Sequence, residues 1–136
     1  MLEVLRVRVA FADTDAMGVA WHGNYVRWFE MARTELMRPT ELPYPALVGR
    51  GIHLPVIEAL VRYRKPARYD DLLIVRIGRV HGSGVRLRID YRIDCDGALI
   101  AEGHTEHAFT DAGGRVTRPP RDVREIFDRL SAAHGG

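Results

Sequence analysis

The residues best suited to chemistry lie in the segment 13–25, which reads DTDAMGVAWHGNY. Asp15 offers a carboxylate that could act as a general base or a nucleophile, and His22 lies at the other side of the same candidate site. Gly18 and Gly23 allow the backbone to approach a ligand closely. This set would suit hydrolysis of an activated carbonyl. The alternative is purely structural, because aspartate and threonine in loops commonly close turns.

A helix with a wide apolar face is predicted to follow this segment. Asn24 is the predicted N-cap and Pro39 ends the pattern. The apolar positions recur at intervals of three or four, at Tyr25, Trp28, Phe29, Ala32, Leu36 and Met37. The N-terminus of such a helix carries unpaired N–H groups and a partial positive charge, which can polarise a carbonyl and stabilise an oxyanion. The predicted site therefore lies where the loop enters the helix.

The rest of the chain predicts an antiparallel sheet that covers this helix. Apolar and polar residues alternate in five segments, two pairs of which are joined by glycine-containing turns at 81–84 and 95–97. The predicted strands cover 5–11, 52–64, 68–80, 85–94 and 98–110. A short amphipathic helix is predicted over about 121–131. This order predicts an α+β fold, with the sheet wrapped around one helix.

Composition narrows the class of protein. The 136 residues suffice for one domain, and 46% hydrophobic with 28% charged residues is typical of a globular chain. A single cysteine excludes an internal disulfide and a cysteine-based zinc cluster. No segment approaches the roughly 20 apolar residues of a membrane helix, and no signal region precedes the first strand. We therefore expect a cytoplasmic protein that does not insert into membranes.

Arginine dominates the basic residues. Lys65 is the only lysine, so 19 of the 20 basic residues are arginine, yet the formal net charge is only +2. Acidic residues are interleaved with them, whereas a nucleic-acid surface needs a clustered basic stripe. We expect no nucleic-acid partner and at most a local anion site, which arginine serves well.

Two other polar patterns have simpler explanations. Glu102, His104 and Glu106 share one strand face and could suggest a metal site, but a solvated face explains them more simply, so we predict no metal and no cofactor. The pair Asp13 and Asp15 has the spacing of the aspartates in phosphoryl-transfer hydrolases. Those enzymes need a parallel α/β sheet and a longer chain.

Two stretches carry a family resemblance. Residues 8–35, beginning RVAFADTDAMGVAWHGNY, closely resemble the signature of the hot-dog-fold acyl-CoA thioesterases. The nearest group is the 4-hydroxybenzoyl-CoA thioesterase-like superfamily, in particular its Tol–Pal-associated branch. Residues 63–71, YRKPARYDD, resemble the second block of that group. The resemblance implies a single hot-dog domain over 1–136, with a five-stranded antiparallel sheet around one long central helix.

The resemblance also implies roles for residues of the loop. Asp15 would be the catalytic carboxylate, as nucleophile or as general base on water, and His22 would assist proton transfer. The backbone N–H groups of His22 and Gly23 would hold the thioester oxygen. Asp13 would shape the loop. Gly18 would contact substrate.

Further roles fall outside the loop. Tyr25 is a candidate for substrate contact, although Tyr25, Trp28 and Phe29 fit the core better. The phosphates of coenzyme A would meet cations of the second block. These are Arg64, Lys65 and Arg68, for which solvated strand ends are the simpler reading.

The family pattern further implies a homo-oligomer, a dimer or tetramer joined through its sheets, with sites at the interface. The chain departs from the pattern at Phe11, where many members carry tyrosine, and at Met17, where a smaller residue is common. Two other functions remain open. One is a non-catalytic module that binds acyl-CoA or an acyl carrier, and the other is a hot-dog dehydratase.

Overall fold

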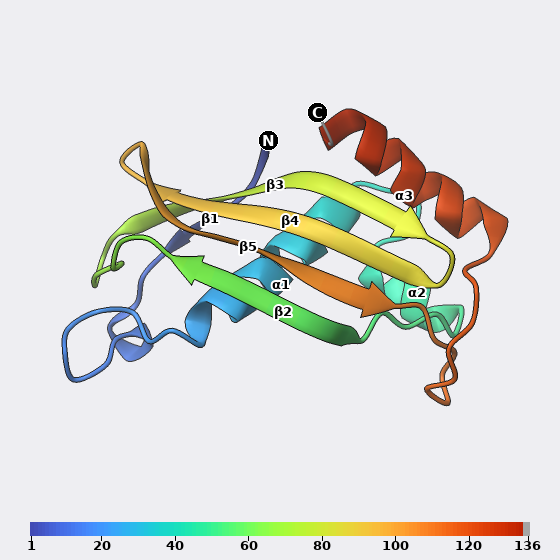
Figure 1. Cartoon of the computed structure of the whole chain (residues 1–136), viewed down its shortest axis with the longest axis horizontal. Helices are drawn as coiled ribbons and strands as arrows, with labels where there is room; N and C mark the ends of the chain where they lie inside the picture. Colours follow the sequence, from blue (N-terminus) through green and yellow to red (C-terminus); the bar gives the residue numbers. More distant parts are fainter. Residues whose placement is uncertain (135–136) are drawn as a thin grey trace.

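A five-stranded antiparallel sheet curls around one long helix in the computed structural model, which describes residues 1–134 (Figure 1). The strands lie in the order β1-β3-β4-β5-β2, so β1 and β2 form the two edges. Their bounds are β1 Leu2–Arg8, β2 Val56–Tyr63, β3 Leu72–Ser83, β4 Arg86–Cys95 and β5 Ala98–Ala108. The helices are α1 Asn24–Met37, α2 Tyr44–Gly49 and α3 Arg121–His134. The predicted α+β architecture is confirmed.

The core lies between α1 and the concave face of the sheet. Along β4, Leu87, Ile89, Tyr91 and Ile93 are fully buried, whereas the alternate residues face outward. The ring of Phe29 on α1 stacks on that of Tyr91, with centroids 4.3 Å apart. Burial of each such side chain contributes roughly 1.5–3 kcal/mol, which holds α1 in a fixed place beneath the sheet.

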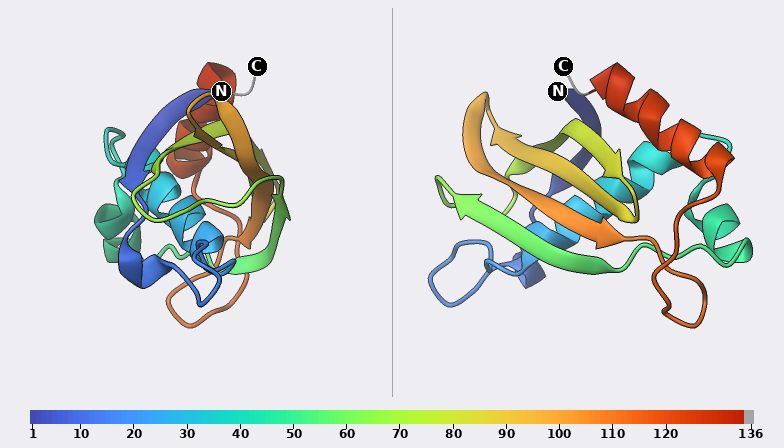
Figure 2. Two further views of the ribbon diagram at one scale, coloured as in Figure 1. Left: turned by 90° about the vertical axis from the view of Figure 1, so that its left-hand side faces the viewer. Right: turned by 45° about the vertical axis from the view of Figure 1, so that its right-hand side comes forward.

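The C-terminal helix α3 lies across one end of the sheet and packs against β3 (Figure 2). Val123, Ile126 and Phe127 form its buried face, and the ring of Phe127 meets that of Phe109 edge-on. The predicted helix is therefore present. It continues three residues beyond the predicted end.

The first strand was predicted too far along the chain. β1 ends at Arg8, and residues 11–13 form a 3-10 turn instead of continuing the strand. The Asp13 carboxylate closes this turn by accepting the N–H of Ala10 at 2.9 Å. As a result the side chain of Phe11 is 77% exposed and does not join the core.

The starts of β2 and β3 and the end of β3 also differ from the predictions, each by three or four residues. β2 starts at Val56 because Pro55 has no N–H to donate to the sheet. β3 starts only at Leu72, after Asp70 adopts a left-handed φ of 70°. β3 then continues to Ser83, so the predicted turn at 81–84 lies further along, where Gly84 has a φ of +61°.

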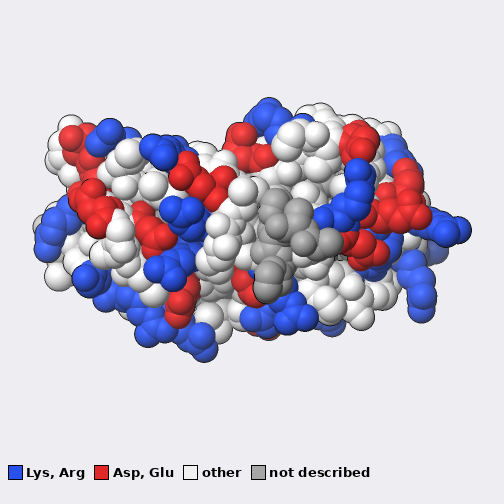
Figure 3. All heavy atoms as spheres, turned by 90° about the horizontal axis from the view of Figure 1, so that it is seen from above, with Lys and Arg blue, Asp and Glu red and all other residues white. Residues whose placement is uncertain are grey.

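The surface mixes the two signs of charge. Figure 3 shows basic and acidic side chains interleaved over one face of the molecule. On the sheet, Arg76 and Arg92 both pair with Asp94, at 3.2 and 2.8 Å. Among residues 1–134, no helix has both the length and the apolar character needed to cross a bilayer.

Candidate active site

The loop between β1 and α1 folds back on itself. Thr14 pairs with Ala20 and Val19 pairs with Arg68, which ties this loop to the second sequence block. The Asp15 N–H donates to the carbonyl of Val19 at 2.9 Å, and the turn closes with the Gly18 N–H on the carbonyl of Asp15 at 3.0 Å. Gly18 has a φ of +78°, a conformation that favours glycine. We therefore attribute a structural role to Gly18.

Asp15 presents its carboxylate at the surface of this loop. Its Oδ1 accepts the N–H of Met17 at 2.8 Å, which fixes the direction of the side chain. In the described part of the chain, Oδ2 accepts no hydrogen bond, and the side chain is exposed. The carboxylate is thus oriented by the backbone while one oxygen remains open to water or substrate.

The oxygens of Asp13 all accept hydrogen bonds from neighbouring residues of the loop and of α1. Its Oδ1 accepts from Arg27 at 2.7 Å, Oδ2 accepts from Ala10, and its main-chain oxygen accepts from the backbone N–H of Trp21. The amide of Asn24 donates to the same main-chain oxygen at 2.7 Å. The prediction of Asn24 as N-cap is wrong, since Gly23 occupies that position and Asn24 is the first helical residue.

The start of α1 offers free backbone donors. In the part of the chain that the structure describes, neither the N–H of His22 nor that of Gly23 makes a hydrogen bond. A Cβ at Gly23 would lie 2.1 Å from Cζ3 of the Trp21 ring, so a larger residue there would displace this half-exposed ring. Two unpaired N–H groups at the positive end of a 14-residue helix can stabilise a developing oxyanion.

A pocket of about 280 Å³ opens beside these donors. It brings together four of the predicted residues, His22, Tyr25, Arg64 and Lys65. Tyr63 also lines it, although its sequence position predicts no role in a site. Asp15, Gly18, Gly23 and Arg68 do not line this pocket in the single chain.

Tyr25 and Tyr63 form the aromatic wall of the pocket, with their rings edge to face at 4.9 Å. Tyr25 is only 2% exposed, and burial raises the pKa of both phenols. Both are therefore neutral at physiological pH. Tyr25, Trp28 and Phe29 are all buried, as the core interpretation predicted.

The three predicted phosphate-binding cations differ in availability. Arg64 is engaged with Glu102 at 2.6 Å, and this hydrogen bond lowers the pKa of the Glu102 carboxyl. Lys65 and Arg68 are exposed, and neither forms an ion pair within the described residues. Lys65 and Arg68 are thus the cations that are free to meet a phosphate.

The acidic strand face does not gather into a metal site. Glu102 binds Arg64, while His104 contacts Glu58 at 2.7 Å on the neighbouring strand β2. Over residues 1–134, no three side chains of the metal-binding types lie close enough to share an ion.

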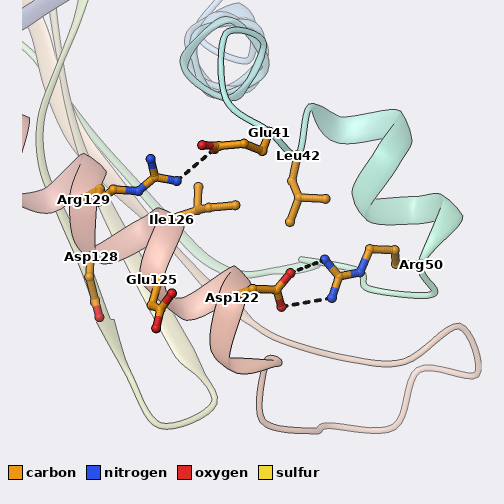
Figure 4. Close-up of a pocket in the computed structure, with 8 residues that line it drawn as sticks. All are labelled: Glu41, Leu42, Arg50, Asp122, Glu125, Ile126, Asp128 and Arg129. Atoms are coloured by element: carbon orange, nitrogen blue, oxygen red, sulfur yellow. Dashed lines mark hydrogen bonds and ion pairs between the residues drawn. The ribbon is translucent and has the colours of Figure 1, made fainter.

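A cavity of about 810 Å³ lies between the α1–α2 connection, the end of α2 and α3 (Figure 4). Two ion pairs cross it, Arg50 with Asp122 at 2.6 Å and Arg129 with Glu41 at 2.8 Å. Neither arginine is free to bind a ligand, and no predicted site residue lines the cavity. We assign these contacts to the anchoring of α3.

Comparison with known proteins places these features in a family. Residues 9–127 match the thioesterase-like superfamily. The acyl-CoA thioester hydrolase YbgC of Escherichia coli O6:H1 is 38% identical over 97 residues, 71% of this chain and 72% of that protein.

Solved structures agree over most of the chain. The hypothetical protein TT1821 from Thermus thermophilus is 34% identical, with a TM-score of 0.89 over 95% of this chain and 99% of that one. The DHNA-CoA thioesterase from Staphylococcus aureus is 29% identical, with a TM-score of 0.87 over 94% and 89%. The hot-dog fold that the resemblance predicted is confirmed. This chain belongs to the thioesterase-like superfamily.

Proposed function

We propose that this protein hydrolyses acyl-CoA thioesters to a free acid and coenzyme A. The observation that carries the proposal is the placement of Asp15, a carboxylate with one open oxygen, in the loop that leads to the free N–H groups of His22 and Gly23. A thioesterase needs both a base or nucleophile and donors for the carbonyl oxygen. The name of the E. coli relative supports an acyl-CoA substrate.

Two mechanisms of thioester hydrolysis are compatible with this arrangement of residues. Asp15 either takes a proton from water, which then attacks the thioester carbon, or attacks that carbon itself to form an anhydride that water opens. In both routes the carbonyl oxygen becomes negative and accepts hydrogen bonds from the N–H groups of His22 and Gly23. The carbon–sulfur bond breaks, the thiolate of coenzyme A takes a proton, and His22 assists that transfer.

The coenzyme would enter beside the second sequence block. Lys65 and Arg68 supply charge for its phosphates, and Arg64 can join them if it exchanges Glu102 for a phosphate. Tyr25 and Tyr63 would face the thioester arm in the pocket that they line.

The edge strand β2 supports a homo-oligomer, a dimer or tetramer, in which a second copy completes the site. Val56, Ile57 and Tyr63 are exposed apolar residues on this edge. An antiparallel pairing of two β2 strands would cover them and satisfy the free backbone groups of the edge. It would also bring the Val56 end of one copy to the Tyr63 end, and hence the pocket, of the other. The cytoplasmic location and the Tol–Pal-associated branch stay predictions.

A hydrolysis screen over short, long and aromatic acyl-CoAs tests the function, with thiol release as the readout. With the best substrate, Asp15→Asn should lower kcat by at least about 10²-fold. Asp128→Asn, an exposed aspartate on α3, is the matched control and should keep the wild-type rate. A wild-type rate in Asp15→Asn would refute the role of Asp15.

Two other outcomes would overturn thioester hydrolysis altogether. Binding of acyl-CoA without thiol release would identify a binding module. Loss of water from a 3-hydroxyacyl thioester would identify a dehydratase.

A further inference from the structure

A buried arginine lines a cavity that is distinct from the proposed thioester pocket of the same chain. Arg33, in the second half of α1, is only 7% exposed. Its Nε donates to the hydroxyl of Tyr44 at 2.9 Å, its guanidinium covers the Tyr44 ring, and its Nη1 lies 3.5 Å from Nε2 of His107. Within residues 1–134, Arg33 forms no ion pair, although buried charges are normally paired.

The partners of Arg33 are neutral. Nδ1 of His107 lies 3.0 Å from the carbonyl of Leu54, which can only accept, so Nδ1 carries the proton and Nε2 is an acceptor. Nε2 then accepts from the hydroxyl of Thr105 at 2.8 Å, and Thr105 accepts from Tyr91 at 2.8 Å. Burial and the Arg33 charge lower the pKa of His107 to about 4. At neutral pH nothing in this network compensates the guanidinium.

A cavity of about 400 Å³ opens onto this guanidinium. Leu54, Pro55 and Ala112 give it apolar walls, beside Arg33 and Tyr44. The Tyr91 hydroxyl also lies beside the guanidinium. No described residue lies within hydrogen-bond distance of Nη2 in suitable geometry, so its two donors are available to a ligand. The cavity lies at the Val56 end of β2, roughly 23 Å along the strand from Tyr63 of the same chain by the usual rise per residue. In the β2-paired dimer proposed above, this end of the strand would lie beside the Tyr63 end of the second copy.

One acidic residue shares the cavity. Asp111 lines it, but its Oδ1 accepts the N–H groups of Gly113 and Arg115, both at 2.9 Å, and holds its own turn. The Asp111 carboxylate does not reach Arg33 as an ion pair. The negative charge of Asp111 opposes an incoming anion, so its removal should strengthen anion binding.

We propose that this cavity is a second binding site, for a small carboxylate with an apolar body, held by the Arg33 guanidinium. A carboxylate would supply the missing countercharge and accept the free donors of the guanidinium fork. Its apolar part would cover Leu54 and Pro55. The proposal goes beyond thioester hydrolysis and does not depend on it, although the ligand is of the same class as the acid that such hydrolysis releases.

Calorimetric titration with benzoate and with its neutral isostere benzamide tests the charge requirement. We expect benzoate to bind at least about tenfold more tightly, because only the carboxylate pairs with Arg33. Equal affinity for the two compounds, or no binding of benzoate, would overturn the proposal. The NMR signal of the Arg33 Nε–H should shift on saturation with benzoate, and an unmoved signal would likewise overturn it.

Two variants of opposite sign sharpen the result. Asp111→Asn keeps the Oδ1 acceptor for its turn while removing the negative charge, so it should tighten benzoate binding by about two- to fivefold and leave benzamide unchanged. Arg33→Met should abolish the preference for benzoate. Arg33→Met removes a buried group and can fail to fold. In that case Asp111→Asn is a sufficient test, and an unchanged benzoate affinity in Asp111→Asn contradicts the site.

Discussion

The hydroxyl of Tyr63, the last residue of β2, donates a 2.9 Å hydrogen bond to the main-chain oxygen of His22. These residues are 41 positions apart in the chain. The bond therefore fixes the loop at the start of α1 against the end of an edge strand. The same peptide segment presents the free N–H groups of His22 and Gly23, so Tyr63 is a positioning residue for the proposed oxyanion site.

Tyr63→Phe should lower kcat by roughly three- to tenfold while KM changes little, because the ring remains against Tyr25 and only the anchor is lost. The free energy of unfolding should fall by only about 1 kcal/mol. Steady-state kinetics and urea denaturation measure the two effects. A change in KM alone would show that Tyr63 contacts substrate and does not position the loop.

Gly23→Ala should disturb the same site through packing. The new methyl would meet the Trp21 ring, which must move from its place beside His22. We expect a several-fold loss of kcat and about 1 kcal/mol of stability. Gly49→Ala on α2 is the control, because a Cβ there meets nothing within 4 Å and alanine favours the helix. Equal effects of the two variants would contradict the packing argument.

Glu102→Gln should release Arg64 for the coenzyme. The expected result is a two- to threefold lower KM for acyl-CoA at low salt, since Arg64 no longer pairs with the Glu102 carboxylate. The matching acyl-pantetheine thioester lacks the nucleotide phosphates and should show no change. Arg64→Gln should raise KM for acyl-CoA only. The assignment fails if both substrates respond alike.

The buried His107 makes stability depend on pH. Its pKa is lowered to about 4 in the folded protein, against an ordinary value of 6.5, so below pH 6.5 the unfolded chain binds a proton that the folded protein refuses. The neutral His107 therefore contributes fully to the free energy of unfolding above pH 6.5, and this contribution is lost as the pH falls toward 4. Between pH 6.5 and 5 the free energy of unfolding should fall by about 2 kcal/mol.

That pH interval isolates the histidine from four carboxyls whose pKa values ion pairing lowers, because their stabilising effect is lost only below their ordinary values of 4.5 and 3.8. These are Glu3, Glu41, Glu102 and Asp122. His107→Gln should be less stable at pH 7 and nearly flat between pH 6.5 and 5. Urea denaturation at each pH measures both, and a slope equal to that of the wild type would contradict the assignment.

Periodicity in the sequence was enough to predict the sheet and its central helix. The alternation along β4 and the spacing of Trp28, Phe29 and Ala32 each place all apolar side chains on one face. The structure buries that face in both elements, so the tertiary packing agrees with the local pattern. It failed at Phe11, where the alternation continued but a side-chain carboxylate closed a turn. The prediction of Asn24 as N-cap is wrong for a similar reason, since its amide donates to a main-chain oxygen 11 residues away.

Residue types and the family signature predict a site in the loop before α1, and that location stays a prediction. The partners of its residues could not be predicted, because they come from distant strands. Tyr63 meets His22 and Glu102 occupies Arg64 only once β2 and β5 pair. The network of Arg33 and His107 has a separation of 74 residues and gave no local signal.

The two tryptophans of the chain give the protein an optical reporter of its own. Trp28 is fully buried, whereas Trp21 is 52% exposed, with its ring centroid 4.9 Å from that of His22. Their emission maxima should therefore separate, with the longer-wavelength component from Trp21. Because the Trp21 ring lies beside His22, that component reports when a ligand covers this part of the loop, without any added label.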